Sequence, residues 1–174
     1  MQTFMPYEDY SKSASVLDNK RLGKQRVETY QILLQLCGLN KFLEPREGKW
    51  NHPAMAMWSG HEIALVDYQE AVCQEWTNRG FKDTCLMKSQ RALEVCQNDD
   101  WTVEKPSWIG DIDVHLSHQS NLLRKDKKFY EKFFNVEDDL EYIWPKNNFD
   151  LKTRMKENYL RMLELMKNNF KTSF

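Results

Sequence analysis

The chain has 174 residues, of which 41% are hydrophobic and 29% are charged, proportions that are ordinary for a globular protein with a single core. No apolar run approaches the roughly 18 residues of a membrane-spanning helix, and the N-terminus does not resemble a signal peptide. We therefore expect no membrane contact and a cytoplasmic location. Four widely spaced cysteines without a CxxC motif are interpreted as reduced thiols, in agreement with that location: Cys37, Cys73, Cys85 and Cys96.

The formal net charge of −1 conceals an uneven distribution of charge. Residues 1–145 carry 18 Lys and Arg against 23 Asp and Glu, whereas residues 146–174 carry 7 against 3. Proteins dedicated to DNA usually have a broad basic surface, because contacts with phosphate supply much of their affinity. A nucleic-acid site on the main body must therefore be a local patch.

The apolar residues recur at helical spacing, and the alternating pattern of a half-buried strand is almost absent. In chain order, we expect an irregular segment over residues 1–11 and helices over residues 14–36, 53–79, 84–95, 113–125 and 150–171. A serine at position 11, 13 or 15 is expected to cap the first helix, and Gly38 and Gly80 are expected to end the first two. The predicted fold is all-α: a compact helical bundle forming one domain over residues 1–145, with an extra C-terminal helix in residues 146–174.

The C-terminal extension, residues 146–174, is basic and amphipathic. Its charge could supply DNA contacts, and its apolar stripe could form the seam of a homo-oligomer. We favour a third interpretation, in which the stripe packs on the core of the main body.

The most distinctive stretch of the chain is a basic cluster followed by a single carboxylate. Lys20, Arg21, Lys24 and Arg26 fall within seven positions, and Glu28 follows two residues later. On a helix, residues 20, 24 and 28 share one face and residue 21 lies nearby. Such a face is commonly a solvated row of charges, but Arg is suited to bidentate phosphate contacts and Glu to proton transfer. At this point both a plain helix surface and an anion site with an acid–base carboxylate remain open.

Gly23 lies inside the same predicted helix, where it costs about 1 kcal/mol relative to Ala. It indicates either a close crossing with another helix or room for a ligand, and the sequence does not decide between the two.

Two further segments are candidates for phosphate contact. Asn51 and His52 precede a helix expected to start at Pro53, and helix N-termini attract anions, although His52 could simply cap that helix. In the helix expected over residues 113–125, contact with a nucleic-acid backbone is the favoured interpretation for His118, Asn121, Arg124 and Lys125. A zinc site at His115 and His118 would lack a nearby acidic or Cys ligand, so no metal is expected.

Distinct sequence blocks follow one another along residues 1 to about 145. They are MQTFMPY (1–7), LDNKRLGKQRVE (17–28), NHPA (51–54), MW (57–58), GH (60–61) and RGFKDT (79–84), then Pro106, Trp108, GD (110–111), His115, SH (117–118), SNLLRKD (120–126) and YIWP (142–145). In this order they resemble the bacterial and phage pyrimidine-dimer DNA glycosylase family.

The resemblance implies a compact α-helical DNA repair enzyme of the phage endonuclease V type. Such a glycosylase with AP lyase activity binds damaged double-stranded DNA and flips a base out of the opposite strand. Its free N-terminal α-amine attacks the sugar C1′ and forms a Schiff base; an α-amine ordinarily titrates near about 7.7–8.0, against about 10.4 for Lys, so more of it is nucleophilic at neutral pH. The resemblance assigns catalysis to Glu28 and Met1, and phosphate contacts to Arg21 and Arg26. No cofactor is expected.

Two features depart from the family pattern. Position 2 is Gln, which generally blocks removal of the initiator Met, so the reacting amine would belong to Met1. Lys20 or Lys24 could replace it only by losing a proton far more readily than a lysine usually does. The acidic balance of the body also differs from the basic phage enzyme, and both departures favour an alternative: a non-catalytic protein that binds and sequesters a nucleotide or cyclic nucleotide in the same pocket. The repair enzyme is our first hypothesis.

Overall fold

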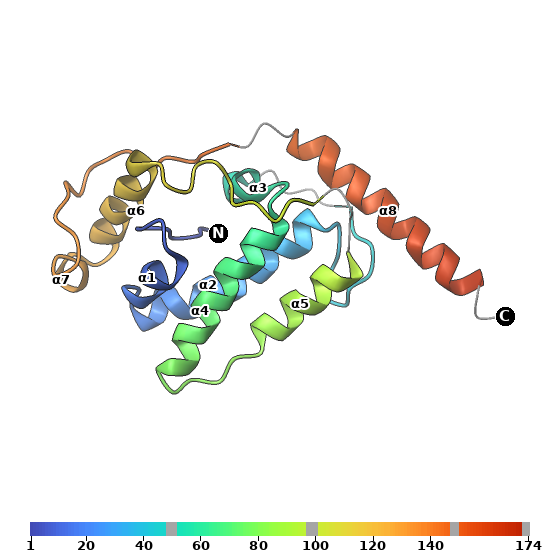
Figure 1. Cartoon of the computed structure of the whole chain (residues 1–174), viewed down its shortest axis with the longest axis horizontal. Coiled ribbons are helices and arrows are strands. Elements are labelled where there is room, and N and C mark those ends of the chain that lie inside the picture. Colours follow the sequence, from blue (N-terminus) through green and yellow to red (C-terminus); the bar gives the residue numbers. More distant parts are fainter. Residues whose placement is uncertain (48–51, 97–100, 147–149, 172–174) are drawn as a thin grey trace.

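The computed structural model describes residues 1–47, 52–96, 101–146 and 150–171 (Figure 1). These ranges contain eight helices and no strand, apart from an isolated antiparallel bridge between Leu39 and Pro45. The all-α prediction is confirmed. The helices are α1 (Tyr10–Ser15), α2 (Asn19–Leu36), α3 (Pro53–Trp58), α4 (Glu62–Asn78), α5 (Cys85–Val95), α6 (Ile112–Lys125), α7 (Lys127–Tyr130) and α8 (Leu151–Lys171).

Helix α2 is the centre of the bundle. It packs against α4 and α5, which also contact each other, and it touches α3 and α8 (Figure 1). Its inner face buries Leu22, Ile32 and Leu33 completely, and α4 presents Tyr68 and Leu65 to the same core. Because apolar burial stabilises by about 25 cal/mol per Å², this face holds α2 in place, while its outer face stays free for charged residues.

The expectation of one helix over residues 14–36 is wrong, because the chain bends between α1 and α2. Asp18 accepts a hydrogen bond from the backbone N–H of Arg21 (3.0 Å) and so starts a new helix at Asn19. Asp9, rather than a serine, caps α1 by accepting from the backbone N–H of Lys12 (2.6 Å). Both helices are therefore capped by a carboxylate, and the serine cap expected for the first helix is wrong. Leu17, in the bend, is fully buried and fixes the turn to the core.

The helix predicted over residues 53–79 is likewise divided into α3 and α4. Gly60 adopts a φ of 88°, a conformation that non-glycine residues rarely take, and breaks the helix there. Glu62 stabilises the break, since its Oε1 accepts from the backbone N–H of Gly60 (3.1 Å). The helices predicted over residues 84–95, 113–125 and 150–171 agree with α5, α6 and α8 within one residue at each end.

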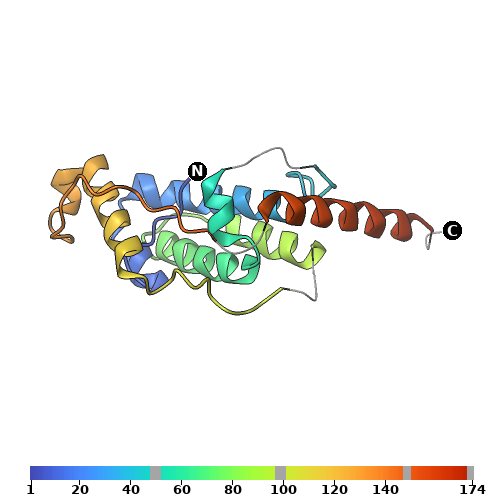
Figure 2. The same cartoon turned by 90° about the horizontal axis from the view of Figure 1, so that it is seen from above.

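Helix α8 lies along one end of the bundle and extends beyond it (Figures 1 and 2). It buries Met155 and Met162, and the Asn158 amide donates to the carbonyl of Leu36 (2.7 Å) at the end of α2. Gly38, with a φ of 66°, allows this approach: a Cβ there would lie 2.8 Å from the backbone nitrogen of Tyr159.

Gly23 allows a similarly close approach between α2 and α4. A Cβ on Gly23 would lie 3.2 Å from the ring of Trp76. The glycine therefore serves a helix crossing rather than a ligand. Among the helices described, none combines the length and apolar composition that a bilayer crossing requires.

Candidate active site

The N-terminal segment, residues 2–6, is threaded through the interior and held by polar groups from several elements. The backbone N–H of Phe4 donates to Gln25 Oε1 (2.9 Å), and the hydroxyl of Tyr68 donates toward the same oxygen (2.8 Å) and the Phe4 carbonyl (3.1 Å). Further bonds run from Trp58 Nε1 to the Thr3 hydroxyl, from the Met5 N–H to His118, from His115 to the Met5 carbonyl, and from Gln119 to the Pro6 carbonyl. These hydrogen bonds fix the backbone of residues 2–6, which was expected to be irregular. They therefore also fix the position of the α-amine of Met1.

This segment brings the α-amine of Met1 between the side chains of Glu28 and His52. The backbone N–H of Gln2 donates to Glu28 Oε2 (3.1 Å), so the carboxylate lies beside the first peptide bond. On the other side, the amine nitrogen lies 3.4 Å from Nε2 of His52. Glu28 belongs to α2 and His52 is the N-cap of α3, so the site forms where these two helices meet. The two predicted catalytic residues, Met1 and Glu28, are thus brought together.

A cationic pocket of about 250 Å³ opens beside Glu28. The basic residues that line it come from two helices: Lys20, Arg21 and Lys24 from α2 and Lys125 from α6. Four predicted phosphate-binding residues therefore share one pocket with the carboxylate. The rest of its lining is Gln2, Phe4 and Gln25.

Two cations of this pocket, Arg21 and Lys125, lie close enough to influence each other. Arg21 pairs with Asp18, which also accepts from the hydroxyl of Tyr130 (2.6 Å), and these bonds keep the pKa of Asp18 low although partial burial opposes them. The pKa of Lys125 is lowered by partial burial and then by the neighbouring charge of Arg21. Positive charges are thus crowded together, and an anion entering the pocket would relieve their repulsion.

Arg26 does not belong to the cationic pocket. Its guanidinium pairs with Asp83 (2.7 Å), donates to the Lys82 carbonyl (3.2 Å) and stacks over Trp76 at 4.3 Å. The assignment of Arg26 to phosphate contact is therefore not supported by its position. Helical spacing could have indicated this, because Arg26 lies about 200° around the helix from Lys24.

Three other predicted phosphate-binding residues also lie elsewhere. His118 is fully buried, accepts from the backbone N–H of Met5 (2.9 Å) and stacks on Tyr142 at 4.6 Å, so phosphate does not reach it. Arg124 donates to the carbonyl of Leu140 (2.7 Å) and so holds the segment that follows α7. Asn121 is partly buried on α6, outside the lining of the cationic pocket. Asn51, a further predicted contact, lies outside the described residues.

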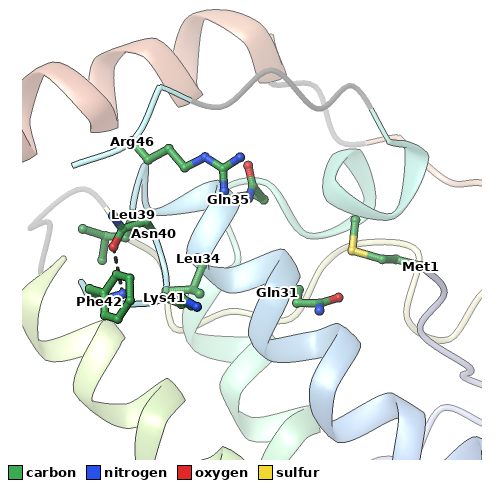
Figure 3. A pocket seen from close by; sticks show the side chains of 9 residues that line it. All are labelled: Met1, Gln31, Leu34, Gln35, Leu39, Asn40, Lys41, Phe42 and Arg46. Atoms are coloured by element: carbon green, nitrogen blue, oxygen red, sulfur yellow. Dashed lines mark hydrogen bonds between the residues drawn. The ribbon is translucent and has the colours of Figure 1, made fainter. Parts of the chain in front are cut away.

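An apolar pocket of about 650 Å³ lies on the other side of Met1 and was not predicted (Figure 3). Figure 3 shows Met1 at one end and Phe42 at the other, with Gln31 and Leu34 of α2 between them. The remaining lining residues are Gln35, Leu39, Asn40, Lys41 and Arg46. The polar residues of α2 thus form one continuous row from Lys20 through Glu28 to Gln35, past the α-amine.

Two residues that support the site, Gln25 and Trp144, were not predicted from the sequence. Gln25 is almost fully buried and accepts from Phe4, although it stands within a run of charged residues. The sequence could have indicated this role, because Gln25 occupies a position on the apolar face of the helix, and a polar side chain buried there requires a hydrogen-bond partner. Trp144 meets the ring of His52 edge-on, with ring centroids 5.6 Å apart. No local pattern predicts that contact.

Comparisons with known proteins identify the family of the chain. A family model described as pyrimidine dimer DNA glycosylase matches residues 1–89, which include Met1, Glu28 and His52. No curated protein and no solved structure matches the chain. Because the family match spans just over half of the 174 residues, the chain belongs to the pyrimidine dimer DNA glycosylase family.

Proposed function

We propose that the protein is a DNA repair glycosylase with AP lyase activity, acting on pyrimidine dimers or other damaged or modified bases in double-stranded DNA. One observation carries the proposal: the Glu28 carboxylate accepts from the first peptide N–H, directly beside the α-amine. A nucleophilic amine and an acid–base carboxylate are the two groups that this chemistry needs.

The reaction begins when the neutral amine attacks C1′ of the deoxyribose. A bond forms between C1′ and the amine nitrogen while the bond from C1′ to the base breaks, and the base leaves with the electron pair and takes up one proton released by the amine. The second amine proton then moves to the ring oxygen as the bond from C1′ to that oxygen breaks, which gives a C1′=N Schiff base and a free 4′ hydroxyl. Removal of a C2′ proton expels the 3′ phosphate and nicks the strand, and water releases the amine. Glu28 is the group placed to move these protons.

The two pockets beside the amine fit the two parts of a nucleotide that this reaction handles. The cationic pocket offers Lys20, Arg21, Lys24 and Lys125 to the phosphates next to the reacting sugar. The apolar pocket offers Leu34 and Phe42, with the amides of Gln31 and Gln35, to a base flipped out of the duplex. Its volume of about 650 Å³ exceeds what a single base requires.

Borohydride trapping tests the proposal directly. The protein is incubated with UV-irradiated or abasic duplex DNA and borohydride, and the covalent adduct is measured, after intact mass has established whether Met1 is retained. We expect an adduct that falls about 100-fold or more in Glu28→Gln, the scale of an acid–base group, and disappears when the α-amine is acetylated. Glu70→Gln, at an exposed position of α4, serves as the matched control and should react normally.

Absence of an adduct with either duplex would contradict the lyase. If the protein then bound deoxyadenosine monophosphate or a cyclic nucleotide tightly and with one-to-one stoichiometry, the nucleotide-sequestering alternative would take its place.

A further inference from the structure

His52 makes two hydrogen bonds that together determine which of its nitrogens carries the proton. Its Nδ1 accepts from the backbone N–H of Ala54 (3.1 Å) and thereby caps α3. A nitrogen that accepts a hydrogen bond carries no proton, and a neutral imidazole has one N–H. The proton therefore lies on Nε2, the atom that faces the Met1 nitrogen at 3.4 Å.

An N–H group on Nε2 is compatible with only one form of its partner. An ammonium group would place N–H against N–H, whereas a neutral amine offers a lone pair to accept the bond. We propose that His52 holds the α-amine of Met1 in its neutral, nucleophilic form by donating Nε2–H to the amine nitrogen. This inference rests on the proposed amine-dependent function and adds a residue that contacts the reacting atom.

The surroundings of His52 keep the imidazole neutral and its ring oriented. Partial burial lowers the pKa of His52, against a smaller opposing effect of Glu28. Trp144 packs edge-on against the ring. The described charged residues that line the two pockets beside the amine come from α2, from the loop after it and from α6: Lys20, Arg21, Lys24, Glu28, Lys41, Arg46 and Lys125.

The arrangement divides the work between two side chains. His52 already carries its proton on the nitrogen facing the amine, so it does not accept another one during the attack on C1′. The amine lone pair leaves the hydrogen bond to form the bond with C1′, and the released proton passes to Glu28. His52 thus prepares the nucleophile, and Glu28 serves the later proton transfers.

The variant His52→Asn distinguishes the proposed hydrogen bond to the α-amine from the N-capping of α3. Asn is among the best N-cap residues, so α3 should persist, but its shorter side chain does not place an N–H at the amine. We expect the midpoint pH at which the α-amine becomes reactive to rise by about one unit, which lowers its reactivity about 10-fold at pH 7 and restores it near pH 9. His61→Asn is the control, because that ring bonds the Glu104 carbonyl (2.9 Å) instead.

Two readouts are measured across pH on both variants and the unaltered protein. Competitive acylation with acetic anhydride, read by mass spectrometry of the N-terminal peptide, reports the neutral amine without DNA. Single-turnover borohydride trapping on abasic duplex reports the reaction. Identical acylation midpoints in His52→Asn and the unaltered protein would overturn the role of His52. A shifted midpoint in a protein that forms no adduct would support that role and contradict the lyase instead.

A measurement on the unaltered protein covers the case in which His52→Asn does not fold. Proton–nitrogen correlation spectra of protein labelled with ¹⁵N-histidine distinguish the two neutral forms of the ring. A proton on Nε2 of His52 is expected, and a proton on Nδ1 would refute the inference.

Discussion

At the scale of single residues, the site depends on buried groups that hold the N-terminal segment. His118 is one of them: its Nδ1 accepts from the Met5 N–H, and the residue is completely buried. Burial, followed by the nearby charge of His115, lowers the pKa of His118 to about 3, against an ordinary value of about 6.5. The ring is therefore neutral in the folded protein throughout the physiological range.

This depressed pKa predicts a loss of stability in acid. The stabilising effect is fully present above about pH 6.5 and declines as the pH falls toward 3, because the unfolded chain binds a proton that the folded protein does not. The free energy of unfolding should fall by about 1.4 kcal/mol per pH unit below 6.5 from this residue alone.

Urea denaturation at pH 7 and pH 5 measures the effect of His118. His118→Asn keeps an acceptor for the Met5 N–H but should be less stable at pH 7. The slope of its free energy of unfolding against pH should be smaller, because the unfolded state takes up about one proton fewer relative to the folded state. His61→Asn provides the comparison for a partly exposed histidine. Equal slopes for His118→Asn and the unaltered protein would contradict the assignment.

At the scale of helices, α8 is docked on the body through a buried ion pair. Glu62 is completely buried, and its Oε2 lies 3.5 Å from Nη2 of Arg154 on α8. Burial raises the pKa of Glu62, and the guanidinium of Arg154 acts against that rise. Because Glu62 also closes the break between α3 and α4, α8 contributes to the part of the fold that positions His52.

Removal of one partner of this pair should cost more than removal of both. We expect Arg154→Met to lower the free energy of unfolding by about 3 kcal/mol at pH 7, because a carboxylate is left buried without its partner. Adding Glu62→Gln should recover part of the loss. The defect of the single variant should shrink as the pH is lowered from 7, because the raised pKa of Glu62 lets the buried carboxyl take up a proton before it does so in the unfolded chain. A thermodynamic cycle of urea unfolding measures both effects, and strict additivity would contradict the coupling.

At the scale of the whole molecule, charge is local rather than global. The net charge is −1, yet four cations converge on one pocket beside Glu28. DNA affinity should therefore depend on salt through a small set of phosphate contacts, because each neutralised phosphate releases counterions.

This charge distribution predicts which lysines set the salt dependence. Lys20→Ala, Lys24→Ala and Lys125→Ala should each reduce the slope of log affinity against log salt concentration by about 0.9, measured by fluorescence anisotropy on duplex DNA. Lys156→Ala, at an exposed position of α8, should leave the slope unchanged if α8 serves the core. A reduced slope for Lys156→Ala alone would show that DNA binds to α8 and not to the cationic pocket.

Local pattern was sufficient for the all-α class, for helices α5, α6 and α8, and for the row of charges on α2. Helical spacing by itself placed Lys20, Lys24 and Glu28 on one face, because the repeat of 3.6 residues is a property of neighbouring residues. The same pattern missed the bends at Asp18 and Gly60, where a cap or a left-handed backbone interrupts an otherwise continuous periodicity.

Only the tertiary structure decided which of these residues meet. Gln2 contacts Glu28 across 26 residues, Arg26 pairs with Asp83 across 57, and Met5 bonds His118 across 113. Such contacts are set by how helices pack around a shared core, and composition or periodicity carries no record of them. The sequence determined an α-helical bundle with a basic row and one carboxylate. The packing of the first six residues against α2, α3, α4 and α6 decided that an amine lies beside that carboxylate.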